Sequence, residues 1–272
     1  MDKYVVVGNP IAHSRSPEIH QAFAQQFGAV ISYEKVLVAP GGFAAFADEF
    51  AATGGCGMNV TVPFKSDAFA YAPQTDAFAA AAGAVNTLVF AQDQSCTGYN
   101  TDGIGLCTDL QQRHGVALRA SNILLLGAGG AASGVIQPLL AALPNKLIVA
   151  NRTVARAEAL VAHHLSWLQR SAPLSACGFA ELQGSFDVVI NATSTGLSGA
   201  AVPIAPHLVR GAFCYDMSYA EAAVFARWAK QHGAAASVDG LGMLVEQAAE
   251  SFRLWRGVRP QTDPVMAMMR AR

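Results

Sequence analysis

The sequence predicts an α/β protein made of two α/β domains, the first built on a mostly parallel sheet. Short apolar runs alternate with segments of helical period along most of the chain. This alternation is typical of parallel sheets whose strands are connected by helices. The chain has 272 residues, which is above the length at which one hydrophobic core usually stops growing, so two domains are expected.

The first half carries the pattern of an α/β unit that ends in a hairpin. Strands are expected at residues 5–7, 31–38, 58–62, 85–90 and 97–100, the last two paired around a turn at residues 92–95. Helices are expected at residues 16–27 and 43–50, and Pro63 opens another short one. Ser16 is placed as the cap of the first helix, with Pro17 at its first position and Gly28 after its last turn.

The second half repeats the alternation of strand and helix. Strands are expected at residues 123–126, 146–150, 187–190 and 213–216, and helices at residues 102–114, 130–143, 243–256, 263–272 and from Thr153 onward. The domain boundary is placed on the helix at residues 102–114, because an all-apolar strand of new register follows it. The first domain is thus expected to span residues 1–102, completed by the final helices at 241–272, and the second residues 103–240.

Composition excludes several classes of function. Charged residues make up 14% of the chain and the formal net charge is -1, so there is no basic field to bind nucleic acid. No apolar run approaches the length of a membrane span, and the first residues are too short in apolar content to predict a secretory signal segment. The five cysteines are scattered and the seven histidines lack ligand spacing, which predicts free buried thiols, no metal site and a cytoplasmic protein.

A glycine-rich turn predicts a dinucleotide site. Its residues fit G-x-G-x-x-A directly after an apolar strand and directly before a helix: Gly127, Ala128, Gly129, Gly130, Ala131 and Ala132. Glycines allow the backbone to approach a pyrophosphate closely, and the helix N-terminus offers it unpaired N–H groups and partial positive charge. The second domain is therefore expected to be a Rossmann-type nucleotide-binding domain.

The residues after the next strand favour NADP(H) over NAD. A carboxylate for the ribose 2'-hydroxyl is usual about 20 residues beyond the glycines, but this chain has Asn151, Arg152 and Thr153 there, with Arg156 one helical turn further. Guanidinium groups form bidentate hydrogen bonds with phosphate oxygens, which suits a 2'-phosphate. The alternative is that Thr153 only caps a helix and both arginines are solvated surface charges.

Polar residues of the first domain each have an ordinary structural explanation when taken singly. Ser14 and Ser16 suit a turn and a cap, Asn86 can brace a loop, Lys65 suits a solvated helix, and Asp102 suits a helix start. Their joint occurrence is more specific, because the segments around them resemble, in order, the signature segments of the shikimate dehydrogenase family. These segments are residues 8–17, 58–65, 83–87 and 98–103, followed by 127–132, 151–153, 191–196, 216–219 and 239–248.

The resemblance implies a fold, a reaction and a set of site residues. The reaction is the reversible NADPH-dependent reduction of 3-dehydroshikimate to shikimate, a step of aromatic amino-acid biosynthesis, with substrate bound by the first domain and NADP(H) by the second. Lys65 resembles the catalytic lysine, acting as general acid and base, with Asp102 as its partner. The other implied substrate residues are Ser14 and Ser16 for the carboxylate, Thr61, Asn86, Asp102 and Gln247 for the ring hydroxyls, and Tyr219 in the pocket. The residues implied for the nicotinamide end are Thr193, Met217, Gly240 and Met243.

Two other functions stay open at this point. One is a quinate/shikimate dehydrogenase that uses both NAD and NADP, against which the residues at 151–153 argue. The other is a non-catalytic NADP-binding sensor, which would be expected to lack catalytic groups, and none is missing. The expected partner is a small-molecule substrate bound where the two domains meet, and the chain is expected to be a monomer or a homodimer.

Overall fold

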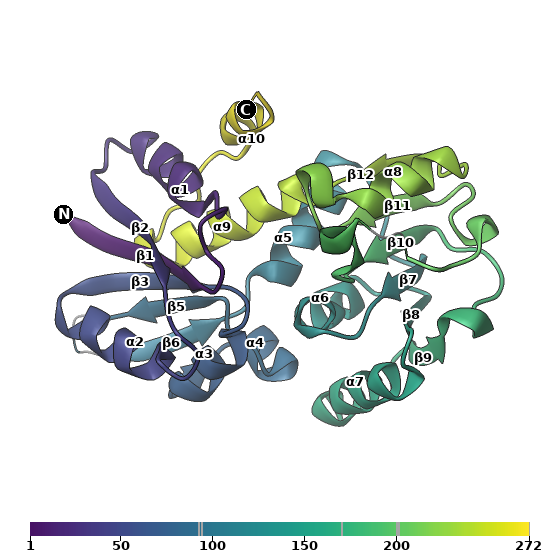
Figure 1. Cartoon of the computed structure of the whole chain (residues 1–272), viewed down its shortest axis with the longest axis horizontal. Coiled ribbons are helices and arrows are strands. Elements are labelled where there is room, and N and C mark those ends of the chain that lie inside the picture. Colours follow the sequence, from purple (N-terminus) through teal and green to yellow (C-terminus); the bar gives the residue numbers. More distant parts are fainter. Residues whose placement is uncertain (92, 94, 170, 200–201, 272) are drawn as a thin grey trace. The chain divides into compact units, whose positions relative to one another are not determined.

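A computed structural model describes residues 1–91, 93, 95–169, 171–199 and 202–271 and divides the chain into two compact units. The first unit comprises residues 1–105 and 245–272, and the second comprises residues 106–244. The division between them falls inside helix α5 (Asp102–Thr108), and helix α9 (Leu241–Arg256) returns the chain to the first unit. Each unit contains a six-stranded sheet (Figure 1).

The sheet of the first unit has the order β2-β1-β3-β5-β6-β4. Its strands are β1 (Asp2–Gly8), β2 (Ile31–Leu37), β3 (Gly55–Val60), β4 (Gln74–Thr75), β5 (Thr87–Phe90) and β6 (Cys96–Tyr99). Among the described pairings, β1 runs parallel to β2 and β3, and β4 runs parallel to β6. The pairs β3–β5 and β5–β6 are antiparallel, and the second pair confirms the expected hairpin. The connection between β5 and β6 is too short for the crossover that a parallel pair would need.

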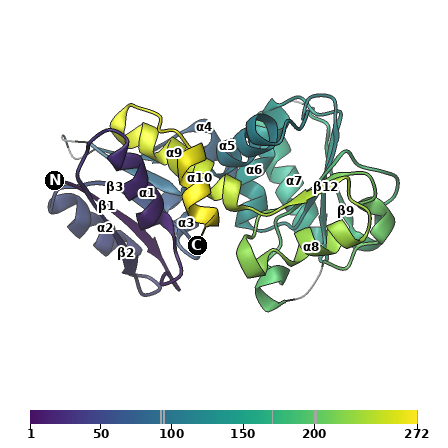
Figure 2. The ribbon, with the colours of Figure 1, turned by 90° about the horizontal axis from the view of Figure 1, so that it is seen from above.

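Alternating side chains of β1 divide the core of the first unit into two layers. Val5 and Val7 pack with helices α2 (Phe43–Ala52), α3 (Lys65–Tyr71) and α4 (Ala77–Ala82). Tyr4 and Val6 belong to the opposite layer with Tyr33 and Trp255. Helix α1 (Ser16–Gln25) and α9 lie on that side, and α10 (Asp263–Arg270) lies beside α1, where the Arg15 side chain donates to the carbonyl of Met269 (Figure 2).

All described strand pairings of the second unit are parallel, in the order β12-β11-β10-β7-β8-β9. The strands are β7 (Asn122–Leu126), β8 (Lys146–Asn151), β9 (Leu174–Gly178), β10 (Val188–Asn191), β11 (Phe213–Asp216) and β12 (Ala236–Val238). Along β7, Ile123 and Leu125 pack with α6 (Gly130–Ala141) and α7 (Val154–Leu168), whereas Leu124 and Leu126 pack with α8 (Val224–Gln231). This is the doubly wound arrangement expected of a Rossmann-type domain.

Several expected elements need correction. Ser16 does not cap α1: Arg15 holds that position and Ser16 is the first helical residue. Helix α3 begins at Lys65 rather than at Pro63, and the helix at residues 102–114 changes to π-helical geometry over Asp109–Arg113. β4 and β12, which are too short for a periodic signal, were not predicted from the sequence, and neither were α4, β9 and α8. Gln92 and Gln94 of the expected turn, and Arg272 of the last helix, lie outside the described residues.

Two expectations from composition concern cysteines and membranes. All five cysteines are free thiols, but only Cys96 and Cys214 are buried, and the other three are half-buried. Within the described chain, no helix combines the length and apolar character that crossing a membrane requires.

The buried histidine His20 is expected to lower the stability of the protein in acid. Its ring is fully buried on α1 and stacks on Tyr33 with centroids 4.6 Å apart. Burial lowers the pKa of His20 to about 3, and a hydrogen bond with the Asn59 side chain acts in the opposite direction. In the unfolded chain this histidine binds a proton with a pKa of about 6.5, whereas in the folded protein it stays neutral until about pH 3. The free energy of unfolding therefore falls as pH decreases from about 6.5 toward 3.

We expect His20→Phe, which keeps an aromatic ring against Tyr33, to remove that acid penalty. Between pH 7.5 and pH 5.0 the variant should lose about 2 kcal/mol less unfolding free energy than the parent protein, as measured by urea denaturation. His13→Gln, a change at an exposed histidine of the same unit, is the control and should follow the parent. Equal losses for His20→Phe and the parent would contradict the assignment.

Candidate functional site

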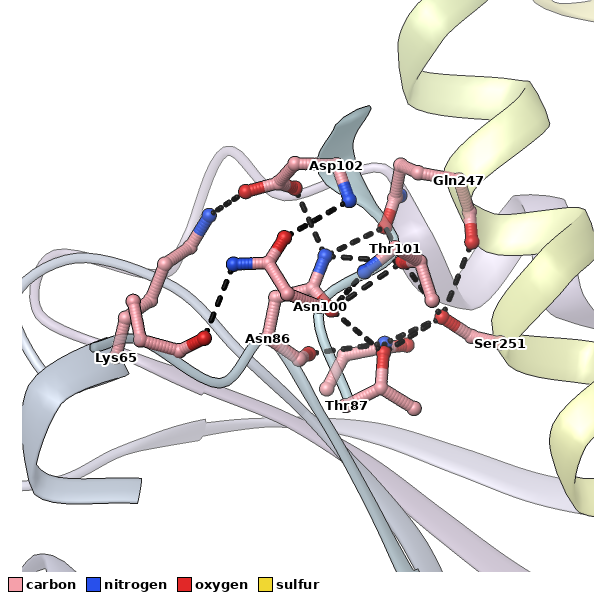
Figure 3. Close-up of polar contacts among 10 residues, drawn as sticks. Lys65, Asn86, Thr87, Asn100, Thr101, Asp102, Gln247 and Ser251 are labelled. Atoms are coloured by element: carbon pink, nitrogen blue, oxygen red, sulfur yellow. Dashed lines mark hydrogen bonds and ion pairs between the residues drawn. The ribbon is translucent and has the colours of Figure 1, made fainter. Parts of the chain in front are cut away.

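The polar centre of the first unit is an ion pair between two helix starts. Lys65 is the first residue of α3 and Asp102 the first of α5, and the Lys65 Nζ donates to Asp102 Oδ2 at 2.5 Å. The side chains are 21% and 10% exposed, so the pair is shielded without being sealed from solvent. The Asn86 Nδ2 donates to the other carboxylate oxygen at 2.8 Å. Both oxygens of Asp102 are therefore held, and the ammonium of Lys65 is aimed by one of them (Figure 3).

The β5–β6 hairpin brings these residues together. Asn86 immediately precedes β5, and residues 100–102 immediately follow β6, so antiparallel pairing places the two segments side by side. Asn86 is buried, and its Oδ1 accepts from the backbone N–H of Thr101 at 3.0 Å. The Asn100 Oδ1 accepts from the backbone N–H of Asp102 at 3.1 Å. These contacts fix the orientation of both Asn86 and Asp102.

Helix α9 contributes Gln247 and Ser251 to the same cluster (Figure 3). The Gln247 Oε1 lies 3.3 Å from the Thr101 Oγ1 and 3.5 Å from the Asn86 Nδ2. The Ser251 hydroxyl lies 2.8 Å from that of Thr87. Lys65, Asn86, Asp102 and Gln247, four of the residues predicted for substrate, thus form one connected group.

A buried polar path continues from this group toward α1. The Asn59 Nδ2 donates to the hydroxyls of Thr87 and Ser251, each at 3.1 Å, and the Tyr33 hydroxyl donates to Asn59 Oδ1 at 2.7 Å. Burial raises the pKa of Tyr33 well above its usual value, and a hydrogen bond with Ser16 acts in the opposite direction. The sequence reading gave no role to Tyr33, Thr87 or Ser251, because a lone polar residue on an apolar element carries no local signal.

Ser14 and Ser16 form a second, smaller polar group at the N-terminus of α1. Their hydroxyls lie 3.2 Å apart, Ser16 is buried and Ser14 is half-buried. Thr61 is half-buried in the loop that follows β3, where its backbone N–H donates to the carbonyl of Val7. A helix N-terminus with two adjacent hydroxyls can bind an anion through neutral donors.

The glycine turn of the second unit has the geometry of a phosphate cradle. Gly127 follows β7 with φ +108°, and a Cβ there would lie 3.1 Å from the backbone of Ala192, so the position requires glycine. Gly129 caps α6, and a Cβ at Gly129 or Gly130 would meet no described atom within 4 Å. Gly129, Gly130 and Ala131 are exposed and Ala128 is half-buried. The helix N-terminus is therefore open to a pyrophosphate.

The residues predicted for a 2'-phosphate lie at the end of β8. Asn151 is the last residue of the strand, and its side chain donates to the carbonyl of Thr153 at 3.0 Å. Thr153 occupies the N-cap of α7 but makes no side-chain capping bond, which weakens its ordinary structural explanation. Arg152 and Arg156 are exposed, so both guanidinium groups are accessible to an anion.

The residues predicted for the nicotinamide gather at the carboxyl ends of β10 and β11. Thr193 is held by Asn191, whose Oδ1 accepts both its backbone N–H and its hydroxyl. A Cβ at Gly240 would lie 2.3 Å from the carbonyl oxygen of Met217, so the two segments touch through backbone. Met243 donates its N–H to the Tyr215 hydroxyl at 3.0 Å. Tyr219, predicted for substrate, also belongs to this unit.

Asp216 organises these strand ends and was not singled out from sequence. Its carboxylate is fully buried at the end of β11 and accepts from the backbone N–H groups of Ser218, Phe225 and Ala226 and from the Asn191 side chain. Burial raises the pKa of Asp216, and these four donors act in the opposite direction. The signal that would have found it is a carboxylate directly after an apolar strand. No cluster of metal-ligating side chains occurs among the described residues.

Comparison with known proteins gives a consistent result along the chain. Residues 6–88 match the family described as shikimate dehydrogenase substrate binding domain, residues 109–198 match shikimate / quinate 5-dehydrogenase, and residues 240–270 match shikimate 5'-dehydrogenase C-terminal domain. A relative named shikimate dehydrogenase (NADP(+)) from Alkalilimnicola ehrlichii is 52% identical, covering 99% of this chain and 98% of the relative.

Solved structures agree with the sequence matches. An enzyme from Pseudomonas putida has a TM-score of 0.92 and 41% identity, covering 98% of each chain. The shikimate 5-dehydrogenase of Thermus thermophilus, solved in complex with NADP(H) and shikimate, has a TM-score of 0.86 and 29% identity, covering 100% of this chain and 99% of that one.

Asp216→Asn should destabilise the second unit. The amide keeps the size of the side chain but turns an NH₂ toward N–H donors, which leaves buried donors unpaired at about 2 kcal/mol of unfolding free energy. Chemical denaturation at neutral pH measures the loss. Glu158→Gln, a change at an exposed carboxylate on α7 of the same unit, should cost little, and an equal effect of both changes would refute the role of Asp216.

Proposed function

The chain belongs to the shikimate dehydrogenase family, and we infer that it is an NADP-dependent oxidoreductase that interconverts 3-dehydroshikimate and shikimate. The observation that carries this proposal is the group formed by Lys65, Asp102, Asn86 and Gln247 in the first unit, in a chain whose second unit holds an open phosphate cradle. Neither feature alone specifies the reaction. Together they supply a proton donor, hydroxyl-binding side chains and a dinucleotide site.

Lys65 supplies the proton in the direction of reduction. When bound, NADPH would supply a hydride to the carbonyl carbon of the substrate, and the electron pair of the C=O bond would remain on oxygen. The Lys65 ammonium stabilises that negative charge and transfers a proton to it, and in oxidation the neutral amine takes the proton back. Asp102 holds the amine by one oxygen and is itself held by Asn86, so the lysine is oriented before substrate binds.

The remaining polar groups match the other parts of the substrate. Ser14 and Ser16 bind the carboxylate at the N-terminus of α1, where N–H groups and partial positive charge favour an anion. Asn86 and Gln247 carry amides, which both donate and accept as ring hydroxyls require, and Thr61 and Asp102 add further partners. Tyr219 is assigned as an additional substrate contact.

The cofactor residues favour NADP(H). The open backbone of residues 127–131 binds the pyrophosphate, and Arg152 and Arg156 with Asn151 and Thr153 bind the 2'-phosphate. Thr193, Met217, Gly240 and Met243 line the nicotinamide end. The five free thiols support a reducing compartment such as the cytoplasm, and the described site residues of one chain are compatible with a monomer or a homodimer.

The function is tested by following nicotinamide absorbance with shikimate or quinate, each with NADP or NAD. We expect turnover with shikimate and NADP to exceed the other three combinations. Comparable rates with quinate and NAD would indicate a quinate/shikimate dehydrogenase of dual cofactor use. Absence of turnover in all four combinations, with NADP still bound, would indicate the non-catalytic sensor.

Lys65→Ala should reduce kcat by about 100-fold or more, because general acid–base catalysis contributes about that much. NADPH affinity, measured by fluorescence titration, should stay within twofold of the parent value. Lys3→Ala removes an exposed lysine of the same unit and is the control for loss of charge. Near-parental turnover of Lys65→Ala would remove this lysine from the mechanism.

Replacing Arg152 and Arg156 together by alanine should raise the KM for NADPH by about 10- to 100-fold, since charge-assisted hydrogen bonds contribute about 1.5–3 kcal/mol. The rate with NADH should not fall, because NADH lacks the 2'-phosphate. Arg210→Ala, at an exposed arginine of the same unit, tests for a general effect of surface charge. Equal losses of activity with NADPH and with NADH would contradict binding of the 2'-phosphate by these arginines.

A further inference from the structure

A buried tyrosine connects strand β11 to the first turn of helix α9. Tyr215 is fully buried, and its hydroxyl accepts the backbone N–H of Met243 at 3.0 Å and donates to Asp109 Oδ2 at 2.7 Å. The first N–H groups of a helix have no partner within the helix. Tyr215 satisfies one of them from another element, and Asp109 sets the direction of its hydroxyl.

Asp109 reaches the same turn directly. Its carboxylate is buried at the start of the π-helical segment and also accepts from the Arg113 Nε at 3.1 Å. A Cβ added to Gly242 would lie 2.1 Å from both carboxylate oxygens, so this carboxylate packs against the bare backbone of the residue before Met243. Burial of a charge at this point is costly unless it is paired and hydrogen-bonded, as it is here.

The turn held in this way carries two of the residues assigned to the nicotinamide end. Gly240 precedes the helix, donates its N–H to the carbonyl of Ser218 at 2.9 Å and touches the Met217 backbone. Met243 is held by a hydrogen bond to Tyr215. Tyr215 lies on β11, two positions before Met217 in the sequence. The Tyr215 hydroxyl therefore fixes how the Met243 segment lies relative to the Met217 segment.

We propose that Asp109 and Tyr215 are a positioning pair for hydride transfer. The pair is buried and acts through the backbone of residues 240–243, which it holds at the nicotinamide end of the site. This inference rests on the proposed function, because it assigns a role to a site defined there. Misplacement of a reacting group by about 1 Å can reduce a rate by as much as 100-fold, so a lost anchor is expected to affect the chemical step.

Tyr215→Phe is the test, because it keeps the buried ring and removes only the hydroxyl. Single-turnover oxidation of NADPH by 3-dehydroshikimate, followed in a stopped-flow instrument, should be slower by about tenfold or more. Affinity for 2',5'-ADP, a probe that occupies only the adenine end of the site, should stay within twofold. Asp109→Asn, which preserves side-chain volume, should show the same split with a smaller decrease.

Tyr71→Phe provides a matched control, since the Tyr71 hydroxyl also donates to a carboxylate, that of Asp48 at 2.9 Å, in the first unit. It should leave the single-turnover rate unchanged. A Tyr215→Phe rate within twofold of the parent would overturn the proposal, as would a loss of 2',5'-ADP affinity by the same factor as the rate. Failure of the proposed function is distinguished separately, because the parent protein would then show no turnover of 3-dehydroshikimate.

Discussion

The Asp102 carboxylate is the contact on which the first unit's site depends. One oxygen holds the Lys65 Nζ and the other accepts from Asn86, so the direction of the lysine is set by a group that is itself held from two sides. The arrangement is possible because a short hairpin brings the residues before β5 and after β6 together. A pair this shielded would be costly to form without the amide that completes its hydrogen bonding.

The second unit uses the same physical principle at the ends of parallel strands. Asp216 is buried at the end of β11 and accepts four hydrogen bonds, from the backbone of Ser218, Phe225 and Ala226 and from the side chain of Asn191. Asp109 is also buried, and its carboxylate accepts a hydrogen bond from the Tyr215 hydroxyl on the same strand as Asp216. Carboxylates accept several hydrogen bonds at once, so each can fix several loops where the strands end, which is where ligands bind in open α/β sheets.

The polar groups of the two units differ in kind. The first unit contributes neutral hydroxyls, amides and one amine, which suits recognition of a polyhydroxylated carboxylate and proton transfer to it. The second contributes backbone N–H groups and guanidinium groups, which suit phosphates.

The sequence by itself determined the class of fold, the glycine turn and the local contexts of Lys65, Asp102 and the serine pair. These are encoded within a few residues each, through strand and helix periods, a required glycine such as Gly127, and short motifs. It placed Ser16 at the wrong helix position and missed α8 and β9, since caps and short elements depend on neighbours that a local pattern does not contain.

Only the tertiary structure decided which polar residues meet. Tyr33 and Ser251 each contact Asn59, and Asp109 contacts Tyr215, across long stretches of the chain. Nothing near them in sequence distinguishes them from ordinary buried or solvated residues. Their roles come from long-range hydrogen bonds, whose partners are fixed by how strands are ordered and helices packed. A buried polar group must find a partner, but the sequence does not say which one until the chain has folded.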